Sequence, residues 1–123
     1  DAHAKNHSLL YGDTGSDLAP AYDILCTAVY PRLAKPMAMA IGGRAVPDTI
    51  LLKHWLTLVP DTKVAARQLA RTLNDMAAAI GPEADALIAE LAQEGIAHPI
   101  LGDIRRVIEV RATHILRFTE SFG

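Results

Sequence analysis

The sequence contains one cysteine, no long apolar run and little net charge, and each shortage excludes a class of protein. One cysteine cannot pair within the chain, which excludes a disulfide-stapled scaffold. No stretch approaches the roughly 18 consecutive apolar residues that a membrane span requires. The N-terminal residues also lack a basic segment followed by an apolar run, so we expect no signal peptide. These absences predict a protein that has no membrane span and no membrane partner.

The charge balance argues against direct capture of nucleic acid. The sequence contains 12 Lys and Arg residues and 14 Asp and Glu residues, which gives a formal net charge of -2. Half of the 123 residues are hydrophobic, which disfavours disorder and is enough for one compact domain. The chain begins with Asp1 and not with Met, so we expect a processed chain or a piece of a larger protein.

The chain divides near residue 47. In residues 1–46, strand-like runs at 7–11 and 17–19 flank the turn-forming residues 12–16, which predicts a β-hairpin. The run at 37–41 fits either a strand or a packed loop. Residues 47–123 predict four helices, which begin near Asp48, Thr62, Pro82 and Pro99.

The helical periodicity also predicts which side chains are buried. The stripe of the second helix is Ala65, Leu69, Leu73, Met76 and Ile80. The other helices are expected to bury Leu51, Trp55, Leu58, Ala84, Leu87, Ile88, Leu91, Leu101, Ile104, Ile108, Ile115, Phe118 and Phe122. Nothing in these helices requires chemistry.

The candidate chemistry lies in residues 1–23. Asp1 is followed five residues later by Asn6, which is the spacing of a kinase catalytic loop. There the Asp orients the acceptor hydroxyl, and the Asn amide oxygen holds a magnesium ion on the phosphates. A second carboxylate follows a short hairpin, and Asp23 fills that position. Two oxygen ligands together with phosphate oxygens suit Mg²⁺.

The combination of D-A-H-A-K-N, a hairpin and P-A-Y-D resembles the C-terminal part of HipA-type serine/threonine kinases, the toxins of toxin–antitoxin modules. Residues 39–43 resemble the segment that follows the metal aspartate in that family. The resemblance implies that Asp1 is the catalytic base, that Asn6 and Asp23 bind Mg²⁺, and that five residues contact ATP: His3, Lys5, Asn6, Tyr22 and Asp23.

The resemblance implies a mainly α (α+β) fold over residues 1–123, a kinase-like C-lobe whose hairpin and loops (1–46) pack on about four helices (47–123). It implies a HipB-like helix-turn-helix antitoxin as partner and DNA contact only through that antitoxin. It also implies cytoplasmic action, with an aminoacyl-tRNA synthetase as substrate. The chain has no Gly-rich phosphate loop or strand lysine, so we expect a fragment that is inactive alone. It also has no D-F-G, since Tyr22 and Ile24 flank Asp23.

Plainer interpretations stay open. Asp1, Lys5 and Asn6 could be ordinary polar residues, and Asp23 could be a turn former. Arg105, Arg106 and Arg111 could form a solvated helix face or a docking surface for the antitoxin. The single cysteine, Cys26, is expected to be a small buried residue, and His54 a half-buried one.

Two other functions also stay open. The helices could form a non-catalytic interaction module. With a free amine at Asp1, Asp1-Ala2-His3 could bind Cu(II) or Ni(II), because the amine, two amides and the imidazole form a square-planar nitrogen set.

Overall fold

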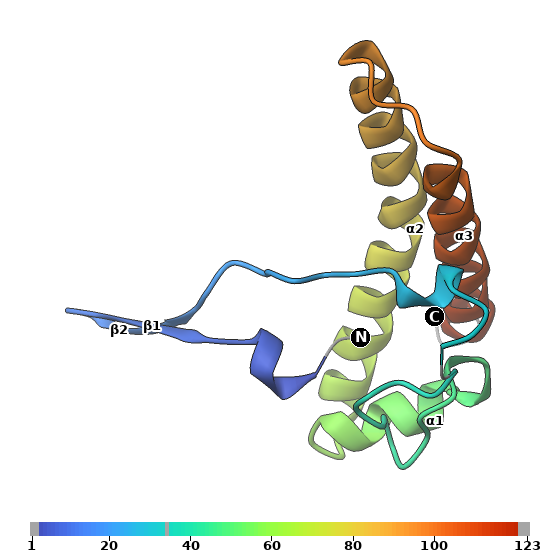
Figure 1. The fold of residues 1–123 in the computed structure, drawn as a ribbon. Coiled ribbons are helices and arrows are strands. Elements are labelled where there is room, and N and C mark those ends of the chain that lie inside the picture. The colour runs from blue at the N-terminus through green and yellow to red at the C-terminus, as the bar shows by residue number, and fades with distance from the viewer. Residues whose placement is uncertain (1–2, 34, 121–123) are drawn as a thin grey trace.

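Two long helices packed side by side form the body of the molecule, and a hairpin projects away from them (Figure 1). The computed structural model describes residues 3–33 and 35–120. The long helices are α2 (Lys63–Gln93) and α3 (Pro99–Thr119). The shorter elements are η1 (Ala4–Asn6), β1 (Leu9–Gly12), β2 (Gly15–Leu18), η2 (Thr27–Val29), η3 (Pro47–Thr49), α1 (Leu52–Trp55) and η4 (Leu56–Leu58).

The predicted hairpin is present, with strands that lie closer to the turn than the apolar runs indicated. β1 and β2 are antiparallel, and Gly12 pairs with Gly15 around a two-residue turn. The Ala19 N–H also donates to the Ser8 carbonyl at 2.8 Å, which extends the pairing toward the base of the hairpin. Every residue of both strands is exposed, so the described residues give the hairpin no packing partner.

The predicted helix over residues 48–59 is wrong, since this segment is broken into η3, α1 and η4. The Ile50 carbonyl, which would accept a helical bond from residue 54, instead contacts His114 Nε2 of α3 at 2.7 Å. His54 accepts the Leu51 N–H on its ring Nδ1 at 2.8 Å and so caps α1. A tertiary contact has therefore replaced the first turns of the predicted helix.

The predicted break at Gly81–Pro82 is also wrong, because α2 runs through both residues. A proline inside a helix removes one hydrogen bond and restricts the residue before it, partly through that residue's Cβ. Gly81 has no Cβ, and it is buried where the Arg105 side chain of α3 crosses α2. Packing against α3 therefore lets α2 continue past its local stop signal. The described residues contain three α-helices, whereas four are expected.

Small residues line the contact between α2 and α3. Ala70, Leu73, Ala77 and Gly81 are buried on α2, and Ala112 is buried on α3. The predicted stripe of the second helix is therefore wrong at Met76, which is 67% exposed, and at Ile80, which is also exposed. Burial predicted for the neighbouring helices is wrong at Leu51, Leu58 and Leu87, which are exposed as well. The buried stripe is rotated toward alanine and glycine because they let two helix backbones approach closely.

A polar contact between α2 and α3 lies near the C-terminal end of α3. Thr119 is buried, and its hydroxyl donates to Asn74 Oδ1 at 3.1 Å. The predicted apolar residue Phe122 lies outside the described residues. Among the described residues, no helix is both long enough and apolar enough to span a membrane.

Candidate functional site

The hairpin brings together two residues that are 17 positions apart in the chain. Asn6 ends the short helix η1, and Asp23 follows β2. The Asn6 side-chain amide donates from Nδ2 to Asp23 Oδ2 at 2.9 Å. Asn6 is only 8% exposed, and among the described residues only Thr119 is a comparably buried polar residue. The side chains of the two predicted metal ligands therefore contact each other directly.

The hydrogen bonds around Asn6 fix the orientation of its amide. The His3 N–H donates to Asn6 Oδ1 at 3.2 Å, so the amide nitrogen must face Asp23. A flipped amide would set oxygen against carboxylate and nitrogen against N–H. Asn6 Oδ1 keeps a second lone pair, and Asp23 Oδ1 has no hydrogen-bond partner among the described residues. Each of the two side chains thus keeps an oxygen that can accept a further bond.

Asp23 has an unusual backbone conformation. Its φ is +53°, and no other non-glycine residue of the described chain has a positive φ. This left-handed region costs an L-residue about 1–2 kcal/mol, although Asp tolerates it better than most. Strained residues of this kind concentrate at functional sites, where surrounding contacts hold them. The contact with Asn6 supplies such a restraint.

Tyr22 forms a second cross-link next to the first. Its hydroxyl donates to the Lys5 carbonyl at 3.0 Å and lies 2.9 Å from Ser8 Oγ. The side chain of Lys5 is exposed, as is Tyr22 itself. The sequence analysis missed Ser8, because a pair of hydroxyls 14 residues apart follows no spacing rule.

His3 contacts Asn6 through its backbone N–H. Its ring Nδ1 is buried and has no hydrogen-bond partner among the described residues. Buried polar atoms without a partner are rare and call for an explanation such as a bound group. The predicted catalytic base Asp1 lies outside the described residues, as does Ala2 of the possible copper or nickel site.

The oxygen donors fit a magnesium site better than an all-protein metal cage. Among the described residues, no cluster of three or more His, Cys, Asp or Glu could hold a metal. Mg²⁺ needs only one or two protein oxygens, because waters and substrate phosphates complete its octahedral shell. Asn6 and Asp23 supply such a pair, so the residues present fit this ion.

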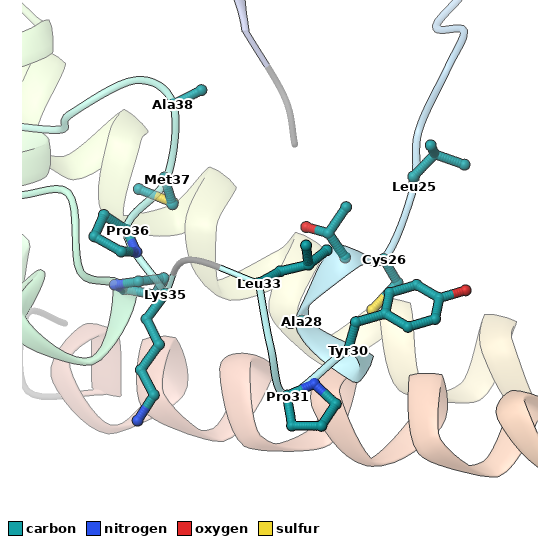
Figure 2. A pocket seen from close by; sticks show the side chains of 12 residues that line it. Leu25, Cys26, Ala28, Tyr30, Pro31, Leu33, Lys35, Pro36, Met37 and Ala38 are labelled. Carbon is teal, nitrogen blue, oxygen red and sulfur yellow. The ribbon is translucent and has the colours of Figure 1, made fainter.

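A groove of about 540 Å³ is lined by residues that begin at Leu25, two positions after Asp23 in the sequence (Figure 2). Leu25, Tyr30 and Leu33 line one side of it, and Pro36 and Met37 line the other. The lining is mostly apolar. Its position places an apolar surface next in the chain to the Asn6–Asp23 pair.

Cys26 also lines this groove and is half-buried, so the expected full burial of its side chain is wrong. His54 is half-buried and hydrogen-bonded, as predicted.

Three arginines of α3 form ion pairs within the chain. Arg105 donates to Asp85 of α2 from Nε at 2.6 Å and from Nη2 at 3.0 Å. These bonds from the guanidinium hold the pKa of the Asp85 carboxyl below its usual value. Arg106 pairs with Asp103, and Arg111 pairs with Asp48. Each arginine of the predicted cluster thus has an acidic partner.

The part of the chain that holds the site matches a known protein family. The family described as HipA-like C-terminal domain matches residues 1–84. Among curated proteins, Putative kinase Y4mE of Sinorhizobium fredii (strain NBRC 101917 / NGR234) is 38% identical over 76 residues. That alignment covers 62% of this chain and 18% of the relative, so the chain spans less than a fifth of its length. No solved structure matches.

Proposed function

This chain belongs to the HipA-like C-terminal domain family, and from that premise we propose that it is part of an ATP-dependent serine/threonine protein kinase. Residues 1–23 would supply the catalytic and metal loops, and the helices would form a kinase-like C-lobe. Transfer would move the γ-phosphoryl group of Mg-ATP to a protein hydroxyl. The proposal goes beyond family membership and rests on the chemistry of the site.

The contact between Asn6 and Asp23 carries the proposal. Kinase phosphoryl transfer needs an amide oxygen and a carboxylate on one side of the transferred group. Here the side-chain amide of Asn6 bonds directly to the Asp23 carboxylate, with Nδ2 2.9 Å from Oδ2, and the aspartate is held in a left-handed conformation. The buried Nδ1 of His3, which has no hydrogen-bond partner among the described residues, supports the same interpretation, since a phosphate bound nearby would offer it a partner.

Asn6 and Asp23 would hold the magnesium ion, which when bound neutralises charge on the phosphates. Lys5 would add a positive charge near them, and Asp1 would accept the proton of the substrate hydroxyl. Most of the rate enhancement would come from holding these groups in place and from their electrostatics. The chain has no Gly-rich loop and no strand lysine, so we expect residues outside these 123 to complete the nucleotide site.

The family resemblance also underlies the partners that we propose: a helix-turn-helix antitoxin and an aminoacyl-tRNA synthetase as substrate. Arg105, Arg106 and Arg111 of α3 offer little support for an electrostatic partner surface, because each already has an acidic neighbour. The exposed Val64, Met76 and Leu87 of α2 instead favour an apolar contact, which would also suit a non-catalytic interaction module.

Phosphoryl transfer by the complete protein that carries this sequence tests the proposal. With γ-labelled ATP and Mg²⁺, Asp23→Ala and Asp1→Ala should each lower the transfer rate at least about 100-fold, because each removes a charge that acts in the transition state. Asp17→Ala is the matched control, since Asp17 is an exposed aspartate of the same hairpin. Near-native transfer by either site variant, or an equal loss in the control, would contradict the assignment.

A further inference from the structure

The hydroxyl of Tyr22 lies at the base of the hairpin between two loops. Its proton goes to the Lys5 carbonyl at 3.0 Å. A phenol has one proton, so the 2.9 Å contact with Ser8 must use the Ser8 hydroxyl as donor. The resulting chain runs from Ser8 through Tyr22 to Lys5. One side chain thus connects the segment before Asp23 with the loop that holds Asn6.

The two cross-links of the site have the same sequence separation. Tyr22 bonds to Lys5 and Asp23 bonds to Asn6, so neighbouring residues on one segment bond to neighbouring residues on the other. The Tyr22–Lys5 bond therefore limits how far Asp23 can move away from Asn6. It also helps to hold Asp23 in its left-handed conformation, which the residue would otherwise leave easily.

We infer that Tyr22 is a positioning residue for the metal pair: its hydroxyl holds Asp23 against Asn6 by bonding to Lys5 and Ser8. This inference rests on the proposed function. It assigns the hydroxyl a role distinct from the nucleotide contact that the family resemblance implies. A nucleotide stacked on Tyr22 would need the ring, whereas the cross-link needs the oxygen.

Tyr22→Phe separates these two roles because it keeps the ring and removes the oxygen. One hydrogen bond contributes about 0.5–1.5 kcal/mol, which corresponds to a change of about 2- to 12-fold in an equilibrium. In the complete protein we expect the Mg²⁺ concentration for half-maximal transfer to rise by about 3- to 10-fold. Transfer at saturating Mg²⁺ and binding of metal-free ATP should change by less than about 2-fold.

Metal binding without catalysis supplies a second readout. The affinity for Mn²⁺, measured by electron paramagnetic resonance with a non-hydrolysable ATP analogue, should fall by the same factor in Tyr22→Phe. Ser8→Ala should give a smaller loss, because the bond to Lys5 remains. In the Tyr22→Phe background Ser8→Ala should add nothing, since the chain of bonds is already broken.

Tyr11→Phe is the matched control, because Tyr11 lies on the same hairpin and is 83% exposed. Unchanged metal affinity in Tyr22→Phe, or an equal change in Tyr11→Phe, would overturn the inference while wild-type transfer continued. Loss of metal-free ATP binding in Tyr22→Phe would also overturn it, because the hydroxyl would then contact the nucleotide itself. If the wild-type protein neither transfers phosphate nor binds Mn²⁺, the proposed function itself fails.

Discussion

The turn at Gly42–Gly43 seats α1 against the preceding loop, and alanine at Gly42 should destabilise the fold strongly. Gly42 has a φ of +55°, a conformation that L-residues disfavour. A Cβ at this position would lie 2.7 Å from the Cα, Cβ and carbonyl oxygen of His54. Two of these are backbone atoms of the segment that holds α1, so a side-chain rotation cannot remove the clash.

The neighbouring glycine, Gly43, distinguishes the energetic cost of a positive φ from the cost of the clash with His54. Gly43 also has a positive φ, +76°, but a Cβ there would meet nothing within 4 Å. Gly43→Ala should therefore lose only the conformational energy, about 1 kcal/mol. Gly42→Ala should lose this energy and a further 1–3 kcal/mol, roughly, for overpacking. The expected loss of unfolding free energy is about 2–4 kcal/mol for Gly42→Ala.

Urea unfolding followed by Trp55 fluorescence is a suitable assay, because the single tryptophan of the chain lies in α1 next to His54. The reasoning requires Gly42→Ala to be less stable than Gly43→Ala by at least about 1 kcal/mol. Equal losses in the two variants would show that residue 42 is not packed against His54.

Two further predictions concern the helices. Pro82→Ala should raise the unfolding free energy by about 1–3 kcal/mol, because it restores a backbone donor inside α2; an equal or lower value in thermal unfolding would contradict a continuous helix. Asp85→Asn should change the acid limb of the stability curve. The pKa of Asp85 is lowered in the folded state by Arg105, so its contribution is present above about pH 4, where the unfolded carboxyl ionises, and is lost as pH falls through the lower folded value. The variant should be less stable at pH 7 and lose less stability below about pH 4, whereas Glu83→Gln, an exposed neighbour on α2, should behave as the parent.

Local signals predicted the elements that depend on local chemistry. Turn residues predicted the hairpin, and Pro99 with its capping His98 marks the start of α3. Tertiary contacts decided the rest. The Ile50 carbonyl bonds to α3 and breaks the first predicted helix, and packing on α3 carries α2 through Pro82. Neither contact can be read from a window of neighbouring residues.

The candidate site divides in the same way. The placement of Asn6 and Asp23 on either side of a hairpin could be predicted from the sequence, because the kinase pattern and the turn residues both constrain it. The structure adds that the two side chains touch. The bond between Ser8 and Tyr22 could not be predicted, since hydroxyl pairs carry no sequence signature. Asp1, the predicted base, lies outside the described residues.

A crystal structure of the complete protein with Mg²⁺ and a non-hydrolysable ATP analogue tests the central claim most directly. The proposed function predicts that an oxygen of Asn6 and an oxygen of Asp23 both coordinate the metal, at about 2.0–2.1 Å. It also predicts that Tyr22 still bonds to the Lys5 carbonyl. A nucleotide-bound metal held by other residues, with Asn6 still bonded to Asp23 and neither of them coordinating the metal, would contradict the account.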